Sequence, residues 1–304
     1  MSPVNHIKRL PCLRAGDRIG VAAPASPFDR ERFGAGVKTL EEMGFEVVCP
    51  KGIYSRHEYL AGTDVHRLAI IHSLFADKTI KAIWCARGGY GSMRLLPHLD
   101  VKLIRENPKV FIGCSDITAV LNFLHARCSM VSFHGPMIIS LSRADERSID
   151  SLKSALTEKQ LITILADTPV TYVSGYSTGP VSGGNLSTLS HLLGTPYFPD
   201  FSGSIVFIED VGEKPYRIDR MLTQLILSGC FNHAAGICLG SFHNCGEKEK
   251  IHQVLMERLS SLSIPVLAGF PAGHDMPSLV VPIGLVARLD TAAGSLSYLE
   301  SAML

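Results

Sequence analysis

Short apolar runs alternate with helical patterns through the first half of the chain, and this alternation restricts the possible folds more than any other feature of the sequence. Segments such as 28–43 and 64–75 carry apolar residues at helical spacing. The apolar runs have the length of buried strands and lie at 17–23, 45–49, 80–85, 109–113 and 130–133. Strand–helix alternation of this kind is typical of a parallel sheet covered by helices on both faces.

The second half of the chain begins after an interruption of this pattern. Residues 140–177 hold a polar helical stretch and then proline- and glycine-rich turns, which we interpret as the crossing between two domains. Strand-like runs follow at 203–209, 235–239 and 265–268, with helical segments at 216–227 and 247–259 and hairpin-like alternation at 279–297. The predicted fold is therefore α/β, with a parallel-sheet domain over 1–165 and a smaller α/β domain with β-hairpins over 166–304.

Composition argues against several classes of function. The net charge is +1, which gives no reason to expect binding to nucleic acid or to a membrane surface. No N-terminal run resembles a signal-peptide core, and no stretch reaches the roughly 18 apolar residues that span a bilayer. The eight cysteines form no C-x-x-C pair, which is typical of reduced thiols in the cytoplasm. No His/Cys spacing resembles a zinc-ligand set, so we expect no metal and no cofactor.

Ser115 is the strongest candidate for a nucleophile. Ligands of an open parallel sheet bind at the carboxyl ends of its strands, and here a strand ends at Gly113 and a helix begins near Asp116. A serine on such a turn directs its hydroxyl away from the sheet and lies beside backbone N–H groups that can stabilise an oxyanion. The alternative is that Ser115 or Asp116 only caps the helix.

A glycine-rich turn, Arg87-Gly-Gly-Tyr-Gly91, also follows a strand. Its N–H groups are candidates for a second oxyanion donor. A phosphate cradle is one alternative, although neither G-x-x-x-x-G-K-[ST] nor G-x-G-x-x-G is present in this turn. The other alternative is that the glycines serve only to make a tight turn.

A serine nucleophile needs a neighbouring base, and two histidines follow predicted strands. His274 lies in a Pro/Gly-rich loop after the run at 265–268. His134 is its rival, because it follows the run at 130–133. Histidine is the residue type whose ordinary pKa suits a base at neutral pH.

Glu209 closes an apolar strand, where a buried carboxylate is costly without a partner. A histidine N–H is a suitable partner and would be oriented by the carboxylate. Asp210 is an alternative for the same role. A salt bridge from Glu209 to Arg217 or Arg220 is the other alternative.

Taken together, the segments of this chain resemble the LD-carboxypeptidase family of serine peptidases, also called the muramoyltetrapeptide carboxypeptidase or MccF-like (microcin-immunity) family. The resemblance spans nearly the whole chain. It is carried, in order, by Val21-Ala-Ala-Pro-Ala-Ser26, Ala86-Arg-Gly-Gly-Tyr-Gly91, Gly113-Cys-Ser-Asp-Ile-Thr118, Phe133-His-Gly-Pro-Met137, Gly183-Gly-Asn-Leu186, Leu193-Gly-Thr-Pro196, Ile208-Glu-Asp210 with Arg217-Ile-Asp-Arg-Met221, Leu239-Gly-Ser-Phe242 and Gly273-His-Asp275.

The resemblance implies roles for individual residues. It implies a Ser–Glu–His triad, for which the matching motifs supply Ser115, Glu209 and His274. It also implies an oxyanion hole of two backbone N–H groups, which map to Asp116 and Gly88, with Gly89 as the alternative to Gly88. His134 falls in a different motif, so we expect it to be structural or to line the substrate site.

The resemblance also implies a substrate and an assembly. Family members have an active site between an α/β N-terminal domain and a smaller C-terminal domain, and are commonly dimers, so we expect a homodimer. The implied substrate is a murein tetrapeptide, a small peptide cut between its L-centre-bearing diamino acid and its terminal D-alanine during cell-wall recycling in the cytoplasm. The free carboxylate of this substrate predicts a cation in the pocket, for which Arg87 is a candidate and helix-terminal packing is its alternative.

Two other functions stay open at this point. One is an MccF-like immunity hydrolase that cleaves toxic peptidyl-nucleotide conjugates, for which we would expect an aromatic residue near the active site; the single tryptophan, Trp84, lies inside a predicted strand. The other is a two-domain protein that binds peptide or sugar fragments without catalysis. Such a protein would tolerate the loss of Ser115.

Overall fold

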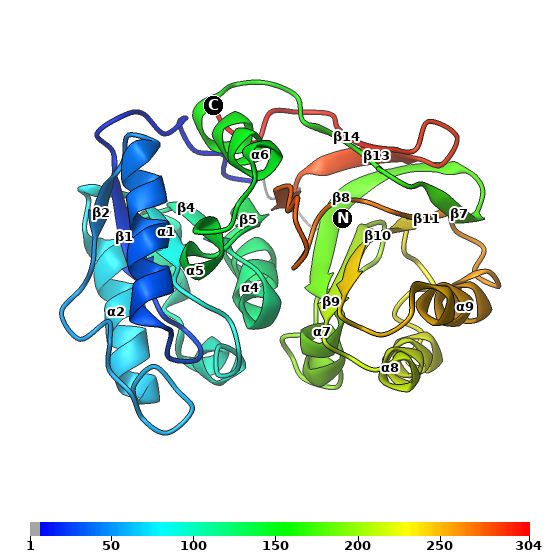
Figure 1. Cartoon of the computed structure of the whole chain (residues 1–304), viewed down its shortest axis with the longest axis horizontal. Coiled ribbons are helices and arrows are strands. Elements are labelled where there is room, and N and C mark those ends of the chain that lie inside the picture. The colour runs from blue at the N-terminus through cyan, green and yellow to red at the C-terminus, as the bar shows by residue number, and fades with distance from the viewer. Residues whose placement is uncertain (1–6) are drawn as a thin grey trace.

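The computed structural model describes residues 7–304, which form two sheets side by side with helices around them (Figure 1). The strands of the first sheet are β1 (Arg18–Ala22), β2 (Glu46–Val48), β3 (Ile80–Cys85), β4 (Val110–Gly113), β5 (Ser132–His134) and β12 (Val281–Ile283). Their order across the sheet is β12-β5-β4-β3-β1-β2, and only β12 runs antiparallel to its neighbour. The predicted parallel sheet in the first half is therefore confirmed.

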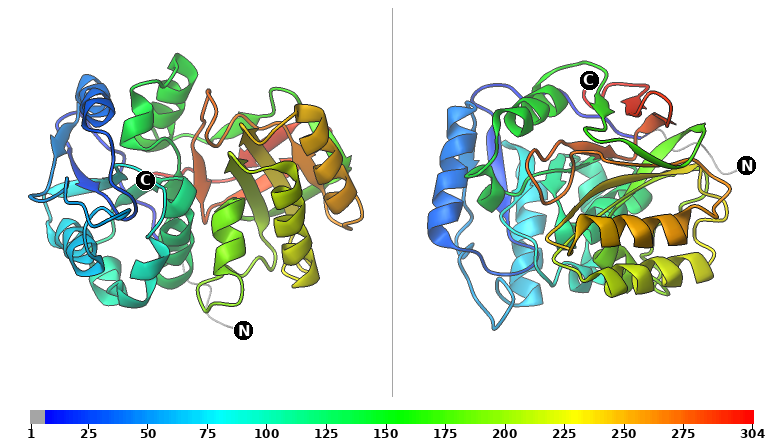
Figure 2. Two further views of the ribbon diagram at one scale, coloured as in Figure 1. Left: turned by 60° about the horizontal axis from the view of Figure 1, so that its bottom comes forward. Right: turned by 45° about the vertical axis from the view of Figure 1, so that its right-hand side comes forward.

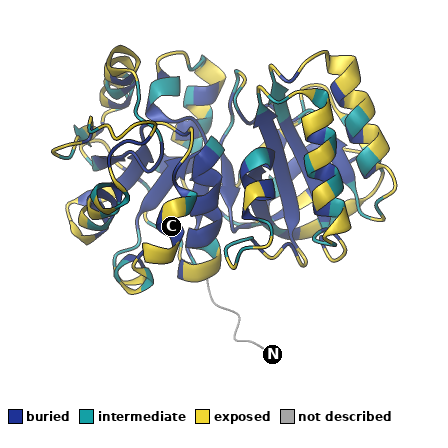
Figure 3. Cartoon of the chain, turned by 90° about the horizontal axis from the view of Figure 1, so that it is seen from below, coloured by how far each residue is buried: buried dark blue, intermediate teal, exposed yellow. Residues whose placement is uncertain are grey.

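Burial explains why these strands are continuous apolar runs in the sequence. In β3 every residue except Lys81 is buried, and in β4 every residue is buried. The helices of this half are α1 (Arg30–Glu42), α2 (Asp64–Ala76), α3 (Val101–Glu106), α4 (Thr118–Cys128), α5 (Ile138–Leu141) and α6 (Glu146–Thr157). Asp29 and Thr63 cap α1 and α2 by accepting hydrogen bonds from backbone N–H groups of the first turn. Figure 3 shows the resulting pattern of buried strands and helices with exposed outer faces.

The second sheet has a parallel centre and antiparallel edges. Its strands are β6 (Thr163–Leu165), β7 (Val170–Val173), β8 (Tyr176–Asn185), β9 (Ile205–Val211), β10 (Gly236–His243), β11 (Val266–Ala268), β13 (Val286–Asp290) and β14 (Ser295–Tyr298), in the order β6-β14-β13-β8-β9-β10-β11-β7. Strands β8 to β11 are parallel, and β13 and β14 form the hairpin predicted for the tail. The helices are α7 (Leu186–Leu192), α8 (Pro215–Leu227) and α9 (Lys248–Leu259), of which α8 and α9 lie side by side (Figure 2).

Strands β6, β7 and β8 lie where we expected proline- and glycine-rich turns at the end of 140–177 and just beyond it. Residues 163–173 already belong to the second sheet as β6 and β7, and β8 is one of its central strands. The error came from the glycines and the proline of β8, which are typical of loops. Here a side chain at Gly183 would press into the backbone of Phe207, so glycine allows close approach of two strands.

Segments of the chain pass between the two sheets in both directions. Strand β12 comes from near the C-terminus and pairs with β5 in the first sheet, with Val281 opposite His134. The division predicted between residues 165 and 166 follows the last residue of β6, which pairs with β14 in the second sheet. The two-domain boundary stays a prediction. Among residues 7–304, no helix has both the length and the apolar character needed to cross a membrane.

Candidate active site

Ser115 lies on a sharp turn between β4 and α4. The strand ends at Gly113, Cys114 is extended, and Ser115 has a φ of 63°, in the left-handed region that residues other than glycine rarely adopt. A short 3₁₀ turn, Ser115–Ile117, then leads into α4. A strained serine between a strand and a helix is the arrangement of a nucleophile elbow, and it goes beyond what a simple helix cap requires.

The glycine-rich turn after β3 lies directly against Ser115. A methyl group placed on Gly88 would be 2.8 Å from Cβ of Ser115, 3.0 Å from its hydroxyl oxygen and 3.4 Å from the backbone nitrogen of Asp116. The two backbone positions predicted as oxyanion donors, Gly88 and Asp116, are thus neighbours beside the serine. Gly89, the alternative donor, has a φ of 106°, and a methyl group placed on it would press against the side chain of Ser26.

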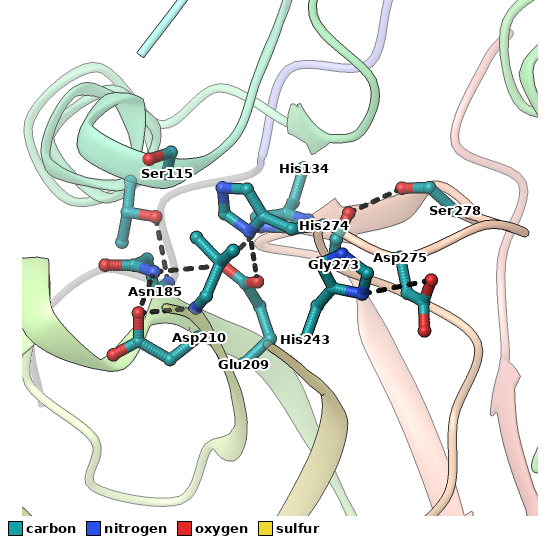
Figure 4. Close-up of polar contacts among 12 residues, drawn as sticks. Ser115, His134, Asn185, Glu209, Asp210, His243, Gly273, His274, Asp275 and Ser278 are labelled. Carbon is teal, nitrogen blue, oxygen red and sulfur yellow. Dashed lines mark hydrogen bonds and ion pairs between the residues drawn. The ribbon is translucent and has the colours of Figure 1, made fainter. Parts of the chain in front are cut away.

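His274 and Glu209 form a buried pair in the second half of the molecule. The Nδ1 atom of His274 lies 2.7 Å from Oε2 of Glu209, at the distance of a charge-assisted hydrogen bond (Figure 4). The Glu209 side chain is fully buried, and that of His274 is 16% exposed. Burial raises the pKa of Glu209, but the two nearby imidazoles of His274 and His134 lower it by more, so its pKa lies below the usual range and the carboxylate stays ionised. Burial lowers the pKa of His274, but the negative charge of Glu209 outweighs it and raises the pKa above its usual value.

The other carboxylate oxygen of Glu209 faces two further side chains. His134 Nε2 lies 3.5 Å from Oε1 of Glu209, which is within ion-pair distance but longer than a usual hydrogen bond, and the His134 side chain is fully buried. The amide of Asn185, at the end of β8, approaches the same oxygen at 3.4 Å. His134, the rival for the role of base in the sequence, therefore lies behind the carboxylate. Asn185 was missed as a site residue, although its motif, Gly183-Gly-Asn-Leu186, was noticed.

Asp210, the alternative to Glu209, has its own set of partners. Its carboxylate accepts hydrogen bonds from the Asn185 amide at 2.9 Å, from the Ser187 hydroxyl at 2.8 Å and from the Val211 N–H at 2.8 Å. These bonds occupy both oxygens and explain how a buried aspartate is accommodated. The alternative salt bridge from Glu209 is not formed either: Arg217 pairs with Glu213, and the guanidinium of Arg220 lies over the ring of Tyr216.

Two cavities meet at Ser115. The first, which we call the arginine-lined cavity, has a volume of about 410 Å³; Ser115, His274, Arg32, Arg87 and Arg143 are among its walls. The second, which we call the acidic cavity, has a volume of about 610 Å³, and its walls include Ser115, Asp116, Asp210 and Glu213. The structure thus brings Ser115 and His274 to one cavity. Within residues 7–304, no hydrogen bond joins the Ser115 hydroxyl to the His274 ring in this conformation.

Polar contacts fix helix α4, which follows the turn of Ser115, against the second sheet. Asn122 on α4 donates to the carbonyl of Gly183 at 2.8 Å and accepts from its N–H at 3.0 Å. Thr118, at the start of α4, accepts from the N–H of Asn185 at 3.0 Å. Strand β8 pairs with β9 such that Asn185 lies opposite Glu209. The contacts between α4 and β8 therefore fix the position of Ser115, just before α4, relative to that of Glu209 on β9.

Comparison with known proteins agrees with this architecture. Family models described as LD-carboxypeptidase N-terminal domain and LD-carboxypeptidase C-terminal domain match residues 19–135 and 178–289. A Bacillus subtilis (strain 168) protein named "Probable murein peptide carboxypeptidase" is 42% identical over 289 residues, which cover 92% of this chain and 91% of the relative. The "Microcin C7 self-immunity protein MccF" of Escherichia coli is 32% identical over 325 residues, which cover 95% and 94%.

A solved structure shows the same fold. The muramoyltetrapeptide carboxypeptidase from Oxalobacter formigenes superposes with a TM-score of 0.80 at 31% sequence identity, over 92% of this chain and 97% of that one. This chain belongs to the LD-carboxypeptidase family.

Proposed function

We propose that the protein is a serine carboxypeptidase that hydrolyses the L,D amide bond to the terminal D-alanine of a murein tetrapeptide. The observation that carries this proposal is the buried Glu209–His274 pair, which opens onto a cavity that Ser115 also lines. The relatives named as murein peptide and muramoyltetrapeptide carboxypeptidases support the choice of substrate.

In the proposed mechanism, the Ser115 hydroxyl attacks the scissile carbonyl carbon while His274 accepts its proton. Glu209 accepts a hydrogen bond from Nδ1–H of His274, which leaves the lone pair on Nε2 free to act as the base. The oxyanion that forms accepts hydrogen bonds from the N–H groups of Gly88 and Asp116. His274 then gives the proton to the leaving amine, D-alanine departs, and water releases the remaining tripeptide from Ser115.

Substrate binding has to complete this arrangement, because the hydroxyl and the imidazole are not hydrogen bonded in this conformation. Catalytic hydrogen bonds are often long without substrate and shorten in the complex. The nucleophile and the base belong to different sheets, so a small change in the placement of one half against the other would bring them together. Full activity of the isolated first half would refute this dependence.

A second candidate function is the hydrolysis of a peptidyl-nucleotide conjugate, as the full-length similarity to the self-immunity protein suggests. Such a substrate calls for an aromatic surface on which a base can stack. Trp84 does not provide it, because its ring is fully buried and its N–H donates to the carbonyl of Pro136 at 2.8 Å. Tyr90, 47% exposed on the wall of the acidic cavity, is the aromatic side chain best placed for stacking.

We also propose that the protein acts in the cytoplasm as a homodimer. All eight cysteines are free thiols in the structure, which fits a reducing compartment. The dimer rests on the family resemblance. Light scattering on the purified protein would give a mass of two chains, and the mass of a single chain would contradict the proposal.

The test of function is mass spectrometry of products after incubation with a murein tetrapeptide and, separately, with a peptidyl-nucleotide conjugate. We expect the tetrapeptide to lose one alanine and the Ser115→Ala variant to release none. Cleavage of the conjugate alone would favour the second candidate. Binding of the tetrapeptide by the unmodified protein without turnover of either compound would contradict both and indicate a non-catalytic binder.

A further inference from the structure

The two cavities that meet at Ser115 differ in charge. Three arginines, Arg32, Arg87 and Arg143, are among the walls of the arginine-lined cavity, and no Asp or Glu lines it within the described part of the chain. The acidic cavity has the reverse composition, with three carboxylates and no Lys or Arg among the described residues of its walls. A substrate that spans both cavities therefore meets a positive potential on one side of the nucleophile and a negative one on the other.

The position of His274 decides which end of the substrate enters which cavity. Its ring lines the arginine-lined cavity and is absent from the walls of the acidic one, whereas Ser115 lines both. The proton that His274 carries must reach the nitrogen of the leaving group. The leaving amino acid therefore lies in the arginine-lined cavity, and its own carboxylate is only one carbon away from that nitrogen.

The three arginines differ in how free their guanidinium groups are. Arg87, the candidate from the sequence, donates to the carbonyl of Pro27 at 2.7 Å. This bond ties the glycine-rich turn to the loop between β1 and α1. Arg32 makes one long contact, 3.5 Å, to the carbonyl of Ile139. The guanidinium of Arg143 has neither a hydrogen-bond nor an ion-pair partner in residues 7–304, although its backbone is held by an N–H bond to Ser140.

We propose that Arg143, with Arg32 on the neighbouring helix α1, binds the terminal carboxylate of the substrate and so makes the enzyme select the last residue of a peptide. This inference rests on the proposed function, since it assigns the leaving group to one cavity. A guanidinium can donate two parallel N–H bonds to a carboxylate, which fixes the orientation of the leaving residue as well as its charge. Arg87 then has a structural role in the turn that carries Gly88.

The inference is tested by binding, which separates it from turnover. In the Ser115→Ala background, the dissociation constants of a murein tetrapeptide and of its C-terminal carboxamide are measured by calorimetry. We expect the carboxylate form to bind about tenfold or more tightly than the carboxamide, as for the loss of a charged hydrogen bond. Adding Arg143→Gln should reduce this preference to about twofold or less, and Arg143→Lys should leave an intermediate preference because it keeps the charge without the planar pair of donors.

The matched control is Arg147→Gln. Arg147 lies four residues farther along and pairs with Asp167 through two contacts of 2.9 Å, away from both cavities. This variant should keep the full preference for the carboxylate. In the active protein, Arg143→Gln should raise KM for the tetrapeptide about tenfold and leave kcat/KM for the carboxamide unchanged.

The outcomes distinguish this inference from the proposed function. Release of D-alanine by the unmodified protein together with an unchanged carboxylate preference in Arg143→Gln would overturn the inference and leave the function standing. An arginine-dependent preference without any release of D-alanine would support the inference and overturn the function. Absence of any preference in the Ser115→Ala protein, including absence of binding, would overturn the inference.

Discussion

The two halves of the molecule position their parts of the site by different means. In the first half, backbone conformation places the proposed nucleophile: Ser115 has a φ of 63°, and the close approach of Gly88 leaves no room for a side chain. In the second half, side-chain contacts place the proposed base: Glu209 holds His274 at 2.7 Å and has His134 behind it at 3.5 Å. The first half should therefore be sensitive to added atoms, and the second half to the loss of hydrogen-bonding groups.

The largest effect is expected at the base itself. His274→Ala should lower kcat about 10⁴-fold or more, because it removes the proposed general base. His243 is a matched control, since it lines the same cavity but pairs with Asp275 at 3.1 Å rather than with Glu209. His243→Ala should keep most of the activity. Equal losses in the two variants would contradict the assignment of His274.

The next effect tests the carboxylate that holds the base. Glu209→Gln should lower kcat about 10³-fold, because the amide can bind the imidazole in the wrong tautomer. The pH profile gives an independent measurement. The neutral imidazole is the active form, so kcat/KM falls as the pH drops through the pKa of His274. Burial lowers this pKa, but the charge of Glu209 raises it by more, so the pKa lies above its usual value. In Glu209→Gln burial acts without this opposing charge, so the acid limb should move to lower pH. An acid limb that does not move would show that Glu209 does not control His274.

A smaller loss is expected from crowding the nucleophile in the first half. Gly88→Ala places a methyl group 2.8 Å from Cβ of Ser115 and should lower kcat about 10²-fold by displacing an oxyanion donor. Gly34→Ala is the matched control, because Gly34 lies in helix α1 with nothing within 4 Å of the added methyl group. The control should keep full activity and stability. An active Gly88→Ala variant would mean that this turn does not form the oxyanion hole.

The smallest effect concerns His134, which we expect to position Glu209 rather than to contact substrate. His134→Phe keeps the aromatic contact with Phe207 but removes the donor that faces Glu209, and should lower kcat about tenfold. His134→Gln retains a donor and should recover most of this loss. The measurement is kcat and the acid limb of its pH profile for both variants, with melting temperatures as a check on folding. Identical kinetics in Phe and Gln variants would assign His134 a packing role only.

The sequence predicts much of the fold because its strongest signals are local. The buried strands β3 and β4 and the helices α1 and α2 are found within a few residues of their predicted bounds, since apolar period and capping residues act over short distances. Strand β8 was missed because its glycines are explained only by the neighbouring strand that approaches them.

In the candidate site too, local sequence indicates the candidate residues, whereas their contacts depend on the whole fold. Local sequence left Ser115 as a possible helix cap and Glu209 as a possible partner of an arginine, and only the structure shows the left-handed serine and the 2.7 Å contact to His274. The positions of His134 and Asn185 against Glu209 depend on strands that are far apart in the sequence. No local pattern predicts such contacts, because they arise from the arrangement of both sheets.

The most direct test of the account is a crystal structure of the Ser115→Ala variant with an uncleaved murein tetrapeptide. The account predicts that the scissile nitrogen lies about 3 Å from Nε2 of His274, with the scissile carbonyl oxygen accepting from the N–H groups of Gly88 and Asp116. The terminal carboxylate should lie in the arginine-lined cavity. An ordered peptide whose scissile bond lies away from His274, or whose carboxylate lies in the acidic cavity, would contradict it.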